Sequence, residues 1–137
     1  MTLPRRPPDD QPDPAGRRVL LAEDNERLAD LVATALAAAG YEVVVAHDGY
    51  NALALAREQP FDLLLTDWMM PGLTGGALAT WVRDARPLLP MILMTASEQA
   101  VIDSPLWAAV IRKPFGLDDL VAVVGAAVEV HELARES

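Results

Sequence analysis

Five polar side chains lie at the ends of short apolar runs, and their types suit chemistry on a phosphoryl group. Glu23 and Asp24 follow one run, and Asp67, Thr95 and Lys113 follow or end three others. A carboxylate at the end of a buried run costs free energy unless a cation or a hydrogen-bond donor contacts it. If the runs are strands that end at one edge of a sheet, Lys113 and a bound cation can stabilise Asp67 there.

Three carboxylates held together repel one another unless a divalent cation joins them. Mg²⁺ fits, because it takes oxygen ligands and needs only one or two direct carboxylates. Asp67 would act as the nucleophile and form an aspartyl phosphate. Lys113 and the cation would offset the developing charge, and Thr95 would hydrogen-bond the phosphoryl oxygens. Simpler interpretations stay open: Asp24 could cap the next helix, Lys113 could be solvated, and Thr95 could be an ordinary strand residue.

The elements that must position these residues alternate between strand and helix patterns. Continuous apolar runs predict strands at residues 19–22, 42–46, 61–66, 91–95 and 108–113. Apolar residues at helical spacing predict helices at residues 28–39, 49–58, 75–85 and 117–134. Strands separated by helices run parallel, so we expect an α/β fold with a doubly wound five-stranded parallel sheet. Ligands of such sheets bind beyond the carboxyl ends of the strands.

Composition limits the classes of protein to be considered. Residues 1–17 are rich in Pro, Asp and Arg, which predicts a disordered N-terminal tail before a single domain over residues 18–137. The net charge of -9 argues against sequence-independent binding to nucleic acid or to an anionic membrane. The sequence has no cysteine, no signal peptide and no apolar stretch of membrane-spanning length, so the cytoplasm is the expected location.

The sequence resembles the receiver domain of two-component response regulators over residues 18–135. The matching pieces, in the family's order and spacing, are VLLAEDN (19–25), DWMMPGLTGG (67–76), MILMTAS (91–97) and IRKPF (111–115). The resemblance implies a flavodoxin-like (βα)5 fold in which Asp67 accepts a phosphoryl group from a histidine kinase or a phosphotransfer protein. It also implies Mg²⁺ binding by Asp24, Asp67 and the backbone carbonyl of Met69, with Glu23 helping directly or through water.

The resemblance further assigns Lys113 to the acyl phosphate and Thr95 to the switch hydroxyl. Met69 and Ser97 match positions that tune dephosphorylation in the family. One departure lies at Val110, where receivers usually carry a Tyr or Phe that swings inward when the threonine moves toward phosphate. Trp107 is expected to be a poor substitute, because three residues along a strand place it about 10 Å away on the opposite face. It is interpreted as covering core that a shortened helix leaves exposed.

A second departure is the length of the segment between Thr95 and Lys113. It is shorter than the family's usual connection by roughly one helical turn. It also contains Pro105, which disfavours helix at Ser104 and removes a backbone donor. We therefore expect the fourth helix of the receiver fold to be very short, distorted or mobile, and we expect signalling through this region rather than through rotation of an aromatic ring.

Three functional hypotheses remain. Only the letters RES follow the last predicted helix, so the leading one is a stand-alone receiver that acts on a downstream protein target, with a possible homodimer and no direct contact with nucleic acid or membrane. The alternative is a pseudo-receiver, a phosphate-independent interaction module. The third is a Mg²⁺-dependent phosphatase, which is disfavoured because Asp67 is followed by Trp68, Met69 and Met70, with no second acid as general acid. We therefore expect no enzyme activity beyond the chain's own phosphorylation and dephosphorylation.

Overall fold

The chain folds into alternating strands and helices. The structure is a computed structural model and describes residues 17–136, so the predicted tail lies outside the described residues except for Arg17. The elements, in chain order, are β1 (Arg18–Ala22), α1 (Glu26–Ala38), β2 (Glu42–Ala46), α2 (Gly49–Glu58), β3 (Leu63–Asp67), α3 (Gly75–Ala85), β4 (Met91–Thr95), β5 (Ala109–Arg112) and α4 (Leu117–Glu136).

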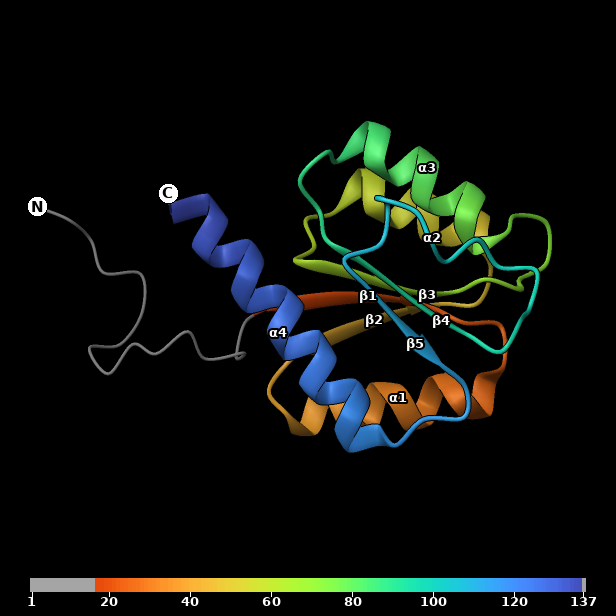
Figure 1. Ribbon diagram of the computed structural model, residues 1–137, viewed down its shortest axis with the longest axis horizontal. Helices are drawn as coiled ribbons and strands as arrows, with labels where there is room; N and C mark the ends of the chain where they lie inside the picture. The colour runs from red at the N-terminus through yellow and green to blue at the C-terminus, as the bar shows by residue number, and fades with distance from the viewer. Residues whose placement is uncertain (1–16, 137) are drawn as a thin grey trace, which may run out of the picture.

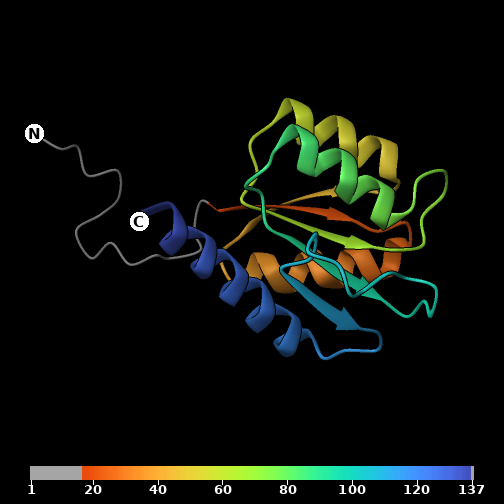
Figure 2. The ribbon, with the colours of Figure 1, turned by 45° about the horizontal axis from the view of Figure 1, so that its top comes forward.

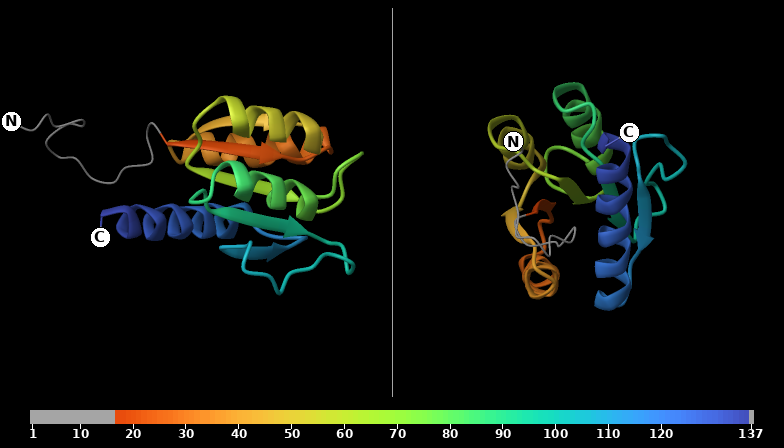
Figure 3. Two further views of the ribbon diagram at one scale, coloured as in Figure 1. Left: turned by 90° about the horizontal axis from the view of Figure 1, so that it is seen from above. Right: turned by 90° about the vertical axis from the view of Figure 1, so that its left-hand side faces the viewer.

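The five strands form one parallel sheet in the order β2-β1-β3-β4-β5. Their arrowheads all point the same way (Figure 2). Helices α2 and α3 cover one face of the sheet, and α1 and α4 cover the other (Figure 1). Seen from above, α4 runs past the end of the sheet at which the strands begin (Figure 3). The predicted doubly wound parallel sheet is confirmed.

Continuous apolar strands supply two cores, one on each face of the sheet. Successive side chains of a strand point to opposite faces, so Leu20 joins the core under α2 and α3, whereas Leu21 joins the core under α1 and α4. All residues of β3 and β4 are buried, as central strands of a covered sheet must be. Burial of each large aliphatic side chain contributes about 1.5–3 kcal/mol to the stability of the fold. A shift of a strand along its neighbours would lose this contribution, so burial fixes where the strands end.

Three strands differ from the predicted ranges by one or two residues at their ends, with β1 starting at Arg18, β3 spanning Leu63–Asp67 and β5 spanning Ala109–Arg112. The third strand begins at Leu63 rather than at residue 61. Just before it, the Asp62 carboxylate accepts a hydrogen bond from the backbone N–H of Arg18, at 2.7 Å. The fifth strand ends at Arg112, because its partner β4 ends at Thr95, the residue paired with Arg112. Lys113 therefore lies one residue beyond the strand.

Turns occupy the segment between β4 and β5, residues 96–108, where the resemblance predicts a fourth helix; no α-helix forms there. Local hydrogen bonds shape the turns: the backbone N–H of Ser97 donates to Thr95 Oγ1, at 2.9 Å, and that of Trp107 donates to Ser104 O, at 3.2 Å. Pro105 has no N–H to donate to a helix. We expected a fourth helix that is very short, distorted or mobile, and the structure agrees in that turns replace a regular helix there.

Trp107 lies in a different place from the predicted one. We expected it on the face of the sheet opposite Val110, but both residues pack into the core under α2 and α3. The prediction was wrong because Trp107 belongs to the turn that starts at Ser104, before β5 begins, so the alternation of a strand does not apply to it. Its indole N–H donates to Val101 O, at 2.9 Å. It fills core in the place of the missing helix, as the sequence had indicated.

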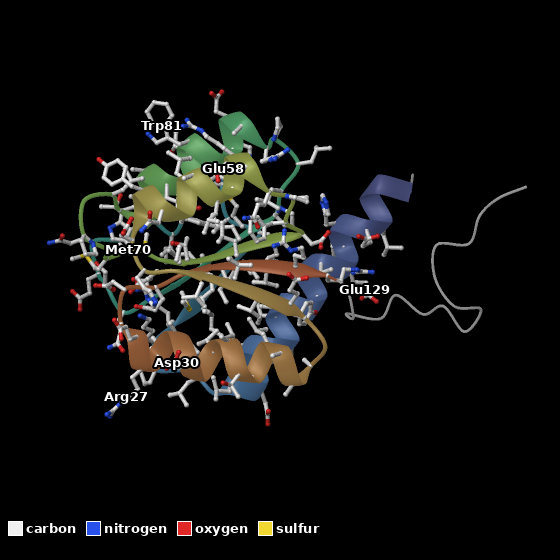
Figure 4. The ribbon with its side chains drawn as sticks, turned by 180° about the vertical axis from the view of Figure 1, so that it is seen from behind. Arg27, Asp30, Glu58, Met70, Trp81 and Glu129 are labelled. Carbon is white, nitrogen blue, oxygen red and sulfur yellow. The ribbon has the colours of Figure 1, made fainter. Side chains whose placement is uncertain are left out.

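Replacement of Trp107 by alanine should therefore destabilise the fold far more than the same change at Trp81. Trp107 is 9% exposed, whereas Trp81 is 51% exposed on the outer side of α3 (Figure 4). Trp107→Ala should lower the free energy of unfolding by about 3–5 kcal/mol, and Trp81→Ala by less than about 1 kcal/mol. Urea denaturation measures both; equal losses would contradict the role given to Trp107.

Candidate functional site

Asp67 ends β3 at the carboxyl edge of the sheet, where it is only 6% exposed. One carboxylate oxygen, Oδ2, accepts from Lys113 Nζ at 2.9 Å. The other, Oδ1, accepts from the backbone N–H groups of Trp68, at 2.7 Å, and Met69, at 3.4 Å. The buried negative charge of Asp67 thus contacts a cation and the dipoles of two backbone N–H groups, which offset the free-energy cost of burying it.

Glu23 lies beside Asp67 and is also buried. Its Oε1 accepts from Lys113 Nζ, at 3.0 Å, and its Oε2 accepts from the backbone N–H of Asn25, at 3.1 Å. Burial raises the pKa of the Glu23 carboxyl, and the nearby charge of Asp67 raises it further. The hydrogen bonds from Asn25 and Lys113 act in the opposite direction without cancelling the rise.

Lys113 joins the two buried carboxylates. Burial by itself would lower the pKa of the Lys113 ammonium, but the hydrogen bonds and negative charges of Asp67 and Glu23 outweigh burial and raise that pKa. Lys113 therefore stays protonated at neutral pH. Its backbone N–H also donates to Thr95 O, at 3.0 Å, which fixes the residue at the end of β4.

The three acids form one cluster. Carboxylate oxygens of Glu23, Asp24 and Asp67 lie within 4.8 Å of one another, with Asp24 exposed to solvent. Oxygen donors at this spacing, open on one side, fit a hard divalent cation that keeps some of its water, as Mg²⁺ does. The donor set is therefore compatible with the predicted magnesium site.

The β1–α1 loop shows two contacts that the sequence reasoning missed. The N-cap of α1 is Asn25, whose side chain accepts from the backbone N–H of Leu28 at 3.0 Å, so the interpretation of Asp24 as the cap was wrong. Asn is as good an N-cap as Asp, so residue type alone does not distinguish the two positions. The ring of His47 is 3.1 Å from Glu23 O; no sequence pattern indicated this contact.

Gly75 allows α3 to begin against the end of β3. Its backbone N–H donates to Trp68 O at 2.8 Å. A Cβ atom at this position would lie 2.1 Å from Asp67 O and 3.0 Å from Trp68 Cα, which are backbone atoms that cannot turn aside. A residue without a side chain is thus needed immediately behind Asp67.

The other predicted residues lie around this cluster. Thr95 ends β4 and is fully buried, and Ser97 lies half-buried in the turn that follows. Met69 is exposed, and its N–H points to Asp67 Oδ1. Val110 lies half-buried on β5, against the core under α2 and α3. The structure thus brings together Glu23, Asp24, Asp67 and Lys113, whereas the roles of Thr95, Met69 and Val110 stay predictions.

Comparison with known proteins assigns the family. Residues 19–125 match the response regulator receiver domain. The chain belongs to this family. It is 38% identical over 109 residues to the response regulator receiver protein CpdR of Brucella abortus (strain 2308), which covers 77% of this chain and 91% of CpdR. It is 35% identical over 114 residues to the sensory transduction protein RegX3 of Mycolicibacterium smegmatis, covering 80% of this chain and 50% of RegX3.

Solved receiver structures share the fold. A CheY-like receiver domain protein from Methanospirillum hungatei JF-1 superposes with a TM-score of 0.80 at 25% identity, covering 86% of this chain and 98% of that one. The receiver domain of the sensor histidine kinase PA1611 from Pseudomonas aeruginosa PAO1, with a magnesium ion coordinated in its active site cleft, gives 0.77 at 27% identity, covering 84% and 99%.

Family membership shows what kind of domain this is. Receiver domains are signalling domains of two-component systems, and phosphorylation on an aspartate is their general function. The chain spans about half the length of other curated relatives that it matches, RegX3 among them. Within residues 17–136, none of the helices has the length and apolar character needed to cross a lipid bilayer.

Lys113→Met should destabilise the fold in a pH-dependent way. Because the pKa of Lys113 is raised from 10.5, its stabilising contribution is present below pH 10.5 and is lost as the pH rises through the folded-state value. Its removal at pH 7 leaves two buried acids without a counter-ion and should cost about 3 kcal/mol. The deficit should shrink toward pH 5, because Glu23, whose pKa is raised from 4.5 even with Lys113 present, then takes up a proton.

Urea denaturation at several pH values measures this deficit. Arg27→Met is the matched control, because Arg27 points away from the body of the protein on α1 (Figure 4). The control should change the free energy of unfolding by less than about 0.5 kcal/mol at every pH. A deficit for Lys113→Met that is independent of pH would contradict the electrostatic account of the site.

Gly75→Ala should disturb the site through the backbone of Asp67. The overlap with Asp67 O should cost about 1–3 kcal/mol of stability, as overpacking of a tight site does. The control is Gly125→Ala in α4, where the nearest atom to a new Cβ is Tyr41 Oη at 3.7 Å. That change should stabilise the helix by about 0.5–1 kcal/mol. Opposite signs in thermal denaturation are the expected result, and a gain at Gly75 would refute the close approach.

Proposed function

We propose that Asp67 is the phosphoacceptor of this receiver domain. The observation that carries the proposal is the placement of a buried carboxylate at the carboxyl end of β3, in contact with Lys113 and within 4.8 Å of the carboxylates of Glu23 and Asp24. In this arrangement Asp24, Asp67 and the backbone carbonyl of Met69 would hold Mg²⁺, with Glu23 helping directly or through water. The cation supplies charge neutralisation at the incoming phosphoryl group.

The proposed reaction transfers one phosphoryl group. A carboxylate oxygen of Asp67 attacks the phosphorus of a phosphohistidine. The bond between phosphorus and the imidazole nitrogen breaks, the nitrogen keeps the electron pair, and an acyl phosphate forms on Asp67. Attack by water on the same phosphorus later releases inorganic phosphate and restores the carboxylate.

The side chains around Asp67 have separate tasks in this proposal. Lys113, which stays protonated, moves its contact from the carboxylate to the phosphoryl oxygens and offsets their charge. Thr95 Oγ1 accepts from the N–H of Ser97, so its own hydroxyl hydrogen remains free to be donated to a phosphoryl oxygen. Val110 has no aromatic ring that could swing inward when Thr95 moves toward the phosphoryl group. The conformational response to phosphorylation therefore has to pass through other residues.

The partners follow from the same chemistry. A histidine kinase or a phosphotransfer protein in the cytoplasm supplies the phosphoryl group, and a downstream protein target reads the phosphorylated state. The protein does not contact nucleic acid or membrane directly, can pair as a homodimer, and catalyses at most its own phosphorylation and dephosphorylation. Receiver domains act with such kinases and transfer proteins as a family; the specific partners are part of the proposal.

The pseudo-receiver is the second candidate, and Val110 is the observation that favours it. Without the aromatic ring of other receivers, phosphorylation could leave the output face unchanged, and the domain would then bind its partner in one state only. The two candidates differ in whether Asp67 is phosphorylated.

Intact-mass spectrometry after incubation with Mg²⁺ and a small acyl-phosphate donor decides between them. The parent chain should gain the mass of one phosphoryl group, and Asp67→Asn should gain nothing. Asp30→Asn, a change at an exposed residue of α1 labelled in Figure 4, should be modified like the parent, whereas Asp24→Asn should be modified at least about tenfold more slowly, because cation binding is weakened. No mass gain in samples quenched early would favour the pseudo-receiver.

A further inference from the structure

A cavity of about 260 Å³ lies between α3 and the turns of residues 96–108. Two indole rings line it, those of Trp68 and Trp107, together with Ala77 and Thr80 of α3 and with Val101 and Leu106 of the turns. It is open to solvent, and turns rather than a regular helix form one of its walls. The mechanism of phosphoryl transfer makes no use of it.

The turn segment that forms one wall of the cavity is apolar and acidic. Val101 and Ile102 are neighbours in sequence and are 57% and 40% exposed, although neither is needed to complete the core. Asp103 follows them directly, and Glu98 comes shortly before them; both acids are exposed. Within residues 17–136 neither acid has an ion-pair partner. Adjacent exposed apolar side chains framed by unpaired charge are typical of a surface that binds another protein.

We propose that this cavity is a docking pocket for one large apolar side chain carried by a basic segment of a partner protein. Its volume is below the range of about 300–1,000 Å³ found for small-molecule sites but suits a single anchoring side chain. Such anchors in desolvated, aromatic-lined pockets contribute most of the binding energy of many interfaces. The exposed acids of the turn segment, of which Asp103 stands between the lining residues Val101 and Ser104, and the net charge of -9 favour positive charge on the partner.

Both walls of the pocket are connected to the phosphorylation site. The backbone N–H of Trp68 donates to Asp67 Oδ1, at 2.7 Å, while the indole of the same residue lies in the pocket. That ring packs over Gly76, where a Cβ atom would lie 2.6 Å from it. On the other wall, the turns begin with the hydrogen bond from Ser97 N–H to Thr95 Oγ1, at 2.9 Å.

A phosphoryl group on Asp67 therefore alters groups on both walls at once. It changes the charge on the Asp67 carboxylate, which accepts from the Trp68 N–H, and it accepts from the Thr95 hydroxyl, whose oxygen accepts from the Ser97 N–H. Docking and phosphorylation are then coupled, and each changes the free energy of the other by the same amount. This coupling rests on the proposed function of Asp67, whereas docking by itself does not.

The first test uses a synthetic peptide with one phenylalanine flanked by lysines. The chain has three tryptophans, and their indole N–H signals in ¹H–¹⁵N NMR spectra report binding. The signals of Trp68 and Trp107 should shift, and that of Trp81, which lies on the outer side of α3 beside Arg57, should not. Peptides with alanine in place of phenylalanine, or glutamate in place of lysine, should bind at least about tenfold more weakly.

Two sets of variants locate the binding. Ala77→Leu places a side chain in the pocket and should weaken binding of the phenylalanine peptide about tenfold, while the same change at Ala54, an exposed residue of α2, should have no effect. The double variant Glu98→Gln and Asp103→Asn leaves the pocket intact and should weaken binding at least about threefold, with a smaller dependence on salt. Unchanged affinity in the double variant, or a shift at Trp81 alone, overturns the docking pocket even if Ala77→Leu fails to fold.

The second test measures the coupling. The titration is repeated with Mg²⁺ and beryllofluoride, a phosphoryl mimic, on the parent and on Asp67→Asn. The peptide affinity should change at least about threefold in the parent and not in the variant. Equal affinities with and without the mimic overturn the coupling but leave docking intact. Absence of phosphorylation in the mass measurement, with docking retained, would instead refute the proposed function alone.

Discussion

The ion pairs of Lys113 with Glu23 and Asp67 are the interaction on which the rest of the site depends. The two carboxylates come from the ends of β1 and β3, which are neighbours in the sheet, and the lysine follows β5, which is separated from β3 by β4. One ammonium group thus ties together three segments that are far apart in sequence. Removal of one member of such a set leaves uncompensated charge in a buried place. The parallel sheet, the close start of α3 at Gly75 and the position of Thr95 all serve to keep this geometry.

Much of this arrangement follows from the sequence, because its causes are local. Apolar runs of four or five residues separated by amphipathic helices leave little choice but a covered parallel sheet, and carboxyl ends of parallel strands meet at one edge. That reasoning is enough to bring Glu23, Asp24, Asp67 and Lys113 together. The predictions that were wrong required a choice between residues that are equally suited to the same position. Asn25 and Asp24 are equally good helix caps, and only the path of the loop decides between them.

The error about Trp107 has a different origin. Its predicted position assumed that the strand pattern extended back to residue 107, whereas the chain turns between Ser104 and Trp107 before β5 begins. A turn changes the direction of a side chain relative to the sheet, and the hydrophobic periodicity of the sequence does not predict by how much. The contact between His47 and the backbone of Glu23 was missed for a similar reason, since it depends on the packing of two loops rather than on either strand.

The residue that pairs with both Glu23 and Asp67 is a lysine, and this has a further consequence. Lys113 is the single lysine of the sequence, and the other ten basic residues are arginines. The chain therefore carries one ε-amine, and the fold places it between two buried carboxylates. Chemistry that acylates lysine side chains can act on this sequence only at that amine. Acylation removes the positive charge of a lysine, so such a modification would change the electrostatics at the centre of the site. The sequence has no other lysine at which the same reaction could occur without this effect.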